Sequence, residues 1–183
     1  MWHRPTPRQV TELAADGCTA VVTLLAERER ASEVQRDVKR AGMQWVWCSL
    51  EGANRQLLAQ RGVHDKVRAS VGEAADIVRG GGTVCIHCAA GIHRTGVFTY
   101  ALARRLGLTP TEAREFLLLA RPVTAWGVKD FRLAVAEEVH QAFAATGTDV
   151  VAETDSTGAV TVPTHGSAGS PAAGAELPKA PPV

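Results

Sequence analysis

The residues best suited to chemistry lie in one short run, His87-Cys88-Ala89-Ala90-Gly91-Ile92-His93-Arg94-Thr95-Gly96. A β-branched apolar run ends just before Cys88, and a helix is expected to begin near Thr95. Between these two elements, backbone N–H groups can converge on one point in front of the positive end of a helix dipole. Gly91 permits the positive φ that the middle of such a turn needs. The run therefore predicts a binding site for a tetrahedral anion.

Two side chains turn this anion site into a reactive one. The Cys88 thiol lies under the ring of donors, so its pKa should fall below the ordinary value of about 8.5 and the thiolate should dominate at neutral pH. Arg94 supplies a planar fork that can hold two oxygens of the anion. A thiolate, an anion-binding turn and a fixed guanidinium together predict phosphoryl transfer to cysteine.

The remaining cysteines allow other interpretations. Cys85 and Cys88 form a Cys-x-x-Cys pair, which also occurs in zinc sites and redox dithiols. No second cysteine pair or histidine cluster completes a zinc site, so we predict no metal and no cofactor. We expect Cys18, Cys48 and Cys85 to be small core residues, and one of them could form a reversible disulfide with oxidised Cys88.

Composition limits the class of protein. The 183 residues carry a formal net charge of +1 and 45% hydrophobic residues, which suits one domain with a real core and argues against a nucleic-acid partner. No apolar run approaches the ~18 residues of a membrane span, and the first residues lack the apolar run of a signal peptide. Four cysteines without an export signal suggest a reducing compartment. We therefore expect a cytoplasmic protein without a membrane partner; no pattern indicates its oligomeric state.

The elements that must position the loop alternate along the chain. The β-branched apolar run at 19–25 predicts a buried strand, and further strands are expected at 44–50 and 83–87. Helices are expected from Pro7, capped by Thr6 and ended by Gly17, then at 32–40, 64–79, from residue 95, at 110–120 and at 129–143. This alternation predicts an α/β fold with a mostly parallel central sheet and helices on both faces. In such sheets ligands bind at the carboxyl ends of the strands, where the loop lies.

Two segments are assigned no role in chemistry. Residues 144–183 are rich in Ala, Gly and Pro and contain no aromatic residue, so they cannot bury enough apolar surface to offset their ordering entropy. We expect residues 1–143 to form the domain and residues 144–183 a disordered tail. The mixed-sign run from Glu27 to Arg30 is interpreted as surface charge.

The frame His87-Cys88-x-x-Gly91-x-x-Arg94-Thr95-Gly96 resembles the signature loop of the cysteine-dependent protein tyrosine phosphatase superfamily. Residues 17–25 followed by Glu27 resemble the early strand of its small dual-specificity branch, as do residues 109–113 and 121–122 further along. The resemblance covers about residues 8–142. It implies a catalytic domain with a parallel-centred sheet flanked by helices, hydrolysis through a phosphocysteine, and no metal.

The resemblance also implies roles for individual residues. Cys88 would be the nucleophile and Arg94 the clamp that tightens on the transferring phosphate. Thr95 would stabilise the thiolate when sulfur leaves, and His87 would orient the loop through hydrogen bonds. The loop backbone would bind the phosphate oxygens through Ala89, Ala90, Gly91, Ile92 and His93.

The reaction also needs a general acid that donates a proton to the leaving oxygen, and here the sequence departs from the family's pattern. The family places an aspartate on the loop after the preceding strand, but here the sequence continues with Glu51-Gly52-Ala53-Asn54. Glu51 is our candidate because it sits at the right strand end with the same chemistry on a longer arm. Asp65 is the second candidate, and a third possibility is that no protein acid takes part.

Substrate class follows only partly from these residues. Lipid and inositol phosphate phosphatases of the superfamily often carry a lysine inside the loop, whereas positions 89, 90 and 92 here are uncharged. This favours one phosphate, such as phosphotyrosine or phosphoserine/threonine on a protein. The alternatives are an RNA 5′-phosphatase, an inositol or small-metabolite phosphatase, and a phosphate-binding module with weak turnover.

Overall fold

The computed structural model describes residues 2–145 of the chain. The expected tail, residues 144–183, lies outside that part apart from the two residues that end the last helix. Within it, no helix is both long and apolar enough to cross a membrane. The elements are α1 (Pro7–Ala15), β1 (Ala20–Thr23), the 3₁₀ turn η1 (Glu27–Glu29), α2 (Ala31–Arg40), β2 (Gln44–Trp47), α3 (Arg55–Leu58), α4 (Arg61–Arg79), β3 (Val84–His87), α5 (His93–Arg105), α6 (Pro110–Ala120), α7 (Pro122–Val128) and α8 (Asp130–Ala145).

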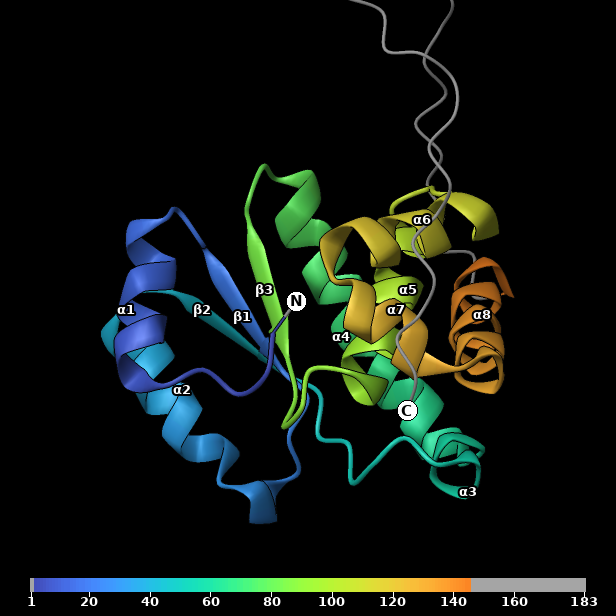
Figure 1. Ribbon diagram of the computed structural model, residues 1–183, viewed down its shortest axis with the longest axis horizontal. Helices are drawn as coiled ribbons and strands as arrows, with labels where there is room; N and C mark the ends of the chain where they lie inside the picture. Colours follow the sequence, from blue (N-terminus) through green and yellow to red (C-terminus); the bar gives the residue numbers. More distant parts are fainter. Residues whose placement is uncertain (1, 146–183) are drawn as a thin grey trace, which may run out of the picture. The chain divides into compact units, whose positions relative to one another are not determined.

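The three strands form one parallel sheet in the order β2-β1-β3. Val21 of the central strand lies opposite Trp45 on one side and Cys85 on the other. Helices α1 and α2 cover one face, and α4 and α5 cover the other (Figure 1). The expected α/β class with a parallel central sheet is therefore confirmed. All three strands end at the same edge, which brings the segments after them together.

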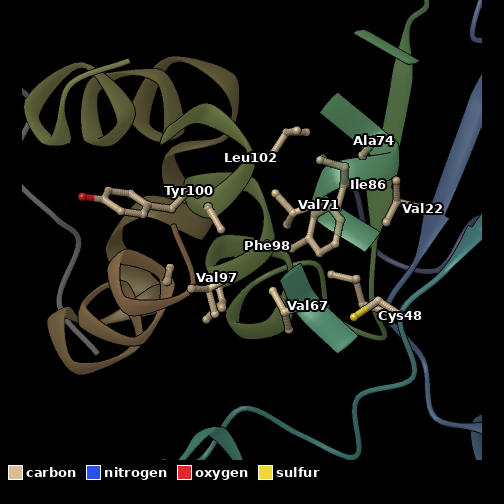
Figure 2. Packing of buried hydrophobic residues seen from close by; sticks show 14 of the residues in the cluster. Val22, Cys48, Val67, Val71, Ala74, Ile86, Val97, Phe98, Tyr100 and Leu102 are labelled. Carbon is tan, nitrogen blue, oxygen red and sulfur yellow. The ribbon is translucent and has the colours of Figure 1, made fainter. Parts of the chain in front are cut away.

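Each face of the sheet has its own apolar core. On the α1 and α2 side, Val10 and Val38 pack in one buried cluster with Val21. On the opposite side, Phe98 of α5 is fully buried and belongs to one cluster with Val71 of α4 and Ile86 of β3 (Figure 2). Because α5 begins directly after the loop, this second core fixes the position of the loop's helical end.

Most predicted helix starts are confirmed, and two short helices were not expected. Thr6 and Thr109 both form capping boxes at the helix starts where they were predicted. Helix α3 has only four residues after its Asn54 cap, and α7 follows α6 after a single residue. Elements this short carry too few periodic positions for the sequence to reveal them. β2 also ends three residues earlier than expected, at Trp47.

Helix α6 offers a matched test of the core. Leu117 is 1% exposed and Leu119, two residues later, is 85% exposed. We expect Leu117→Ala to lower the free energy of unfolding by about 2–5 kcal/mol, because it removes buried methyl groups and leaves a cavity. Leu119→Ala should change it by less than about 0.5 kcal/mol. Urea unfolding followed by circular dichroism measures both; equal losses would contradict the packing described.

Candidate active site

Cys88 lies in the loop that connects β3 to α5, and Figure 1 shows the course of this loop. Gly91 has φ +70°, a conformation that L side chains rarely adopt. Its N–H donates to the Cys88 Sγ at 3.2 Å. The predicted turn is therefore present, with its glycine in the expected conformation and at least one backbone donor aimed at the thiol.

The N-terminal segment supports the loop from one side. Trp2 continues the sheet beyond β3, with its N–H donating to the Ile86 carbonyl at 2.8 Å. The Arg4 N–H donates to the carbonyl of Ala89 at 3.3 Å. A Cβ at Gly91 would overlap the carbonyl of Trp2, so glycine is required here by close approach as well as by φ. No sequence pattern indicated that the first residues would reach the loop.

Helix α7 supports the loop from the other side. The Gly91 carbonyl accepts hydrogen bonds from the Thr124 hydroxyl, at 2.7 Å, and from the Arg121 guanidinium. A Cβ at Gly127 would overlap the side chain of Ile92, so the end of α7 packs directly on the loop. These contacts hold the Gly91 carbonyl on the side of α7, while the Gly91 N–H faces the sulfur of Cys88.

The Cys88 thiol is 3% exposed, yet its pKa is lowered. Burial alone would raise that pKa, but the Thr95 hydroxyl and N–H, the Gly91 N–H and the charge of Arg94 together outweigh it. Thr95 Oγ1 is buried and has no partner with ordinary hydrogen-bond geometry in the described chain, so it is available to the sulfur. The expected thiolate is therefore favoured by its surroundings.

Arg94 is held in place by a residue that the sequence did not reveal. Its Nη1 and Nη2 donate to the two carboxylate oxygens of Glu29, at 2.5 and 2.8 Å. Nη1 also donates to the carbonyls of Leu24, at 3.0 Å, and Leu50, at 2.8 Å. The hydrogen bond from Arg94 holds the pKa of Glu29 below its usual range. Glu29, which we interpreted as surface charge, is thus a positioning residue for the guanidinium.

The other side of the Arg94 guanidinium interacts with Cys88. Burial disfavours the charge of Arg94, but the contacts with Glu29 and with the Cys88 sulfur raise its pKa overall. A guanidinium fixed by a carboxylate on one edge and facing a thiolate on the other has the orientation that a bound tetrahedral anion would need.

His87 lies at the base of the loop and is fully buried. Burial lowers its pKa to about 4, so the ring is neutral at physiological pH. Its Nε2 lies 2.9 Å from the Thr23 hydroxyl, which in turn accepts from the Trp45 indole N–H at 2.8 Å. Because the indole can only donate, the Thr23 oxygen accepts from Trp45 and keeps a second lone pair and its own hydrogen for the contact with Nε2. These contacts tie the strand end below Cys88 to both other strands.

The two candidate acids lie in different places. Glu51 directly follows Leu50, whose carbonyl binds Arg94, and its exposed carboxylate pairs with Arg28 at 2.6 Å. Asp65 is on the second turn of α4, exposed, and pairs with Arg68 at 3.7 Å. The fold therefore brings the backbone of Glu51 next to the loop, while the ion pair of Asp65 lies within its own helix.

The other three cysteines are free and buried. Burial raises the pKa of Cys48 to about 12 and that of Cys85 to about 11, and it also raises the pKa of Cys18. Their expected place in the core is therefore correct, whereas a protective disulfide with Cys88 stays a prediction. Among residues 2–145, no three His, Cys, Asp or Glu side chains gather as a metal site would require.

The lowered pKa of Cys88 predicts selective alkylation. At pH 7, iodoacetamide should modify Cys88 and leave the three buried cysteines intact, as judged by mass spectrometry of the folded protein. The pH at which the alkylation rate is half-maximal should lie below that of a free cysteine. Thr95→Val should raise this midpoint because it removes an O–H donor to the sulfur.

Thr99→Val is the matched control for this experiment. Thr99 is buried one turn later on α5, its hydroxyl has no hydrogen-bond partner in the described chain, and it is not among the groups that shift the pKa of Cys88. The midpoint should not move in this variant. A wild-type midpoint at or above that of free cysteine would contradict the electrostatics of the loop.

Comparisons with known proteins agree with this geometry. The model of a family described as "Tyrosine phosphatase family" matches residues 2–160. The chain is similar in structure to PTPMT1 (TM-score 0.64, 20% identity, covering 80% of this chain and 92% of that one), which has also been solved in complex with PI(5)P. It is similar to human DUSP28 (0.59, 18%, 79% and 94%) and to Tk-PTP in its active form (0.58, 22%, 76% and 88%).

No curated protein matches the sequence. The solved structures, all below 25% identity, establish the fold, and the family model covers most of the chain. The chain belongs to the tyrosine phosphatase family.

Proposed function

We propose that this protein hydrolyses phosphomonoesters, namely phosphotyrosine, phosphoserine or phosphothreonine on proteins, through a phosphocysteine on Cys88. The observation that carries the proposal is the buried Cys88 sulfur with a lowered pKa, contacted by the Gly91 N–H and faced by a guanidinium that Glu29 holds in place. Each part has a function in phosphoryl transfer: a nucleophile, a cradle of donors and a clamp for the charge.

In the first step, the loop N–H groups and Arg94 bind the three non-bridging oxygens of the phosphate. The thiolate attacks phosphorus, a sulfur–phosphorus bond forms, and the bond from phosphorus to the ester oxygen breaks. The departing oxygen takes a proton from a general acid and leaves as an alcohol or phenol.

In the second step, water attacks the phosphocysteine. A phosphorus–oxygen bond forms, the sulfur–phosphorus bond breaks, and the acid of the first step, now a carboxylate, accepts the proton of the water. Cys88 leaves as a thiolate, and the Thr95 hydroxyl and the Gly91 N–H stabilise the charge that returns to sulfur. Inorganic phosphate is released and the loop is restored.

Glu51 is the acid that we propose for these steps. Support comes from its position directly after Leu50, whose carbonyl binds the same guanidinium that would clamp the phosphate. Its ion pair with Arg28 is exposed and therefore weak, so an incoming substrate can replace Arg28 as its partner.

The uncharged loop positions 89, 90 and 92 support a substrate with one phosphate at the reacting centre. A phosphoinositide is the second candidate, since PTPMT1, a structural neighbour, has been solved with PI(5)P. A reducing compartment such as the cytoplasm, expected from the cysteine content, suits a thiolate nucleophile.

The first test is hydrolysis of p-nitrophenyl phosphate between pH 5 and 8 in the presence of EDTA. Wild type should turn over without metal, and Cys88→Ser should lose about 10³-fold or more in kcat, because an alcohol is not ionised in this pH range. Circular dichroism checks that the variant is folded. A folded, reduced wild type that binds inorganic phosphate but releases no p-nitrophenol would indicate a phosphate-binding module instead.

The general acid is tested with two leaving groups. Glu51→Gln should lower kcat on a phosphoserine peptide about 10²-fold or more, because an alkoxide cannot leave without a proton. The same variant should affect p-nitrophenyl phosphate far less, since nitrophenolate leaves unprotonated. Asp65→Asn is the matched comparison: a loss confined to this variant would assign the proton to Asp65, and no loss in either would remove the protein acid from the mechanism.

A further inference from the structure

A row of cationic side chains leads away from the loop. Burial lowers the pKa of His93, at the start of α5, and the nearby positive charges of Arg132, Arg94 and Lys129 lower it further. Arg132 lies over the ring of Phe131, with 4.4 Å between its guanidinium carbon and the ring centroid. Arg55 of α3 also lies over that ring, at 5.0 Å. The contacts thus run from the loop to the start of α8 and on to α3.

No carboxylate neutralises this row. Within residues 2–145, Arg55, Lys129 and Arg132 form no ion pair. The acidic neighbour Asp130 is paired with Arg114 at 2.9 Å instead. Cations without an ion pair also occur elsewhere in the described residues, for example Arg36 and Lys39. What distinguishes this row is its place beside the loop, where its positive charge can attract an anionic ligand.

The backbone holds one of these cations in a costly conformation. Lys129 has φ +63° and ψ 148°, a region that glycine adopts far more readily than an L residue. It lies between α7, whose end packs on Ile92 of the loop, and α8. The Lys129 side chain is exposed, so its burial does not explain why a lysine, and not a glycine, occupies this position. Its ammonium group can contribute positive charge to the row beside the loop.

Arg132 connects the row to residues 48–54, the segment after β2 that carries Glu51, the proposed general acid. Its Nε donates to the carbonyl of Ala53 at 2.5 Å, and its Nη1 donates to the carbonyl of Val128 at 3.2 Å. The guanidinium is therefore fixed between α8 and the segment that follows β2. A fixed charge at the edge of the site can select a ligand at a lower cost in side-chain entropy than a mobile one.

We propose that Lys129, Arg132 and Arg55 form a subsite for acidic residues that flank the phosphorylated residue of a protein substrate. The inference rests on the proposed phosphatase activity. The half-exposed Phe131 ring between the two guanidiniums favours a peptide, because it offers an apolar contact to the chain that carries the acidic groups. The row also leads away from Cys88, whereas a second phosphate on a small ring would need cations inside the loop, where residues 89, 90 and 92 are uncharged.

The test compares two phosphotyrosine peptides that differ only in having two glutamates or two glutamines on each side of the phosphotyrosine. Wild type should favour the glutamate peptide by about fivefold to tenfold in kcat/KM at low salt, since each exposed ion pair contributes a factor of about 1.5 to 5. The preference should fall as NaCl rises from 50 to 500 mM. The double variant Lys129→Gln/Arg55→Gln should reduce it to less than about twofold.

Lys39→Gln is the control, because it removes one positive charge, as each substitution of the double variant does. Lys39 is exposed on α2, on the opposite face of the sheet, and should leave the preference and the hydrolysis of p-nitrophenyl phosphate unchanged. Equal rates on the two peptides in wild type, with p-nitrophenyl phosphate turned over normally, would overturn the subsite and leave the phosphatase intact. Faster hydrolysis of a soluble inositol bisphosphate than of the glutamate peptide, with the same loss in the double variant, would overturn the assignment to peptides.

If wild type hydrolyses none of these compounds, the proposed phosphatase function is contradicted, but the subsite can still be tested by binding. Binding of the two fluorescently labelled peptides to wild type and to Cys88→Ser, measured by anisotropy, then reads the subsite without turnover. Tighter binding of the glutamate peptide that disappears in the Lys129→Gln/Arg55→Gln variant supports the subsite. Equal binding of both peptides overturns it.

Discussion

The structure depends on one guanidinium that joins the ends of all three strands. Arg94, on the helix after β3, binds the Leu24 carbonyl after β1, the Leu50 carbonyl after β2 and the carboxylate of Glu29. Parallel strands make this possible because their carboxyl ends meet at one edge. The same contacts that order the edge of the sheet also aim the clamp at Cys88, so stability and function share one set of hydrogen bonds.

Burying a thiolate is costly, and the fold offsets that cost locally. The loop carbonyls are occupied by α7 and by the N-terminal segment, so its N–H groups can face the sulfur. His87 adds no charge, because burial keeps its ring neutral, and one hydrogen bond with Thr23 fixes its orientation. The stabilisation of Cys88 thus comes from fixed dipoles and from Arg94, which need little reorganisation when the substrate arrives.

The sequence predicted what is encoded locally. The loop from His87 to Gly96, the three strands and the capped helices follow from short-range patterns of turn residues and apolar spacing. The contact between Glu29 and Arg94 joins residues 65 positions apart, and the run around Glu29 has the composition of any charged surface. A 3₁₀ turn followed by Arg30 with φ +62° orients that carboxylate, and no residue pattern indicates such a turn. The supports from Trp2 and α7 were missed for the same reason.

The charges at the site explain why cations outside the loop matter. When Cys88 is ionised, its thiolate and the Glu29 carboxylate carry two negative charges, whereas Arg94 carries one positive charge. A phosphate dianion therefore approaches a group whose net side-chain charge is negative, and the helix dipole supplies only about half a positive charge. Positive charge must come from nearby elements, and Lys129, between α7 and α8, and Arg132 of α8 can provide it. Because that charge lies to one side of the loop, the field that attracts the phosphate also favours substrates with further acidic groups on that side.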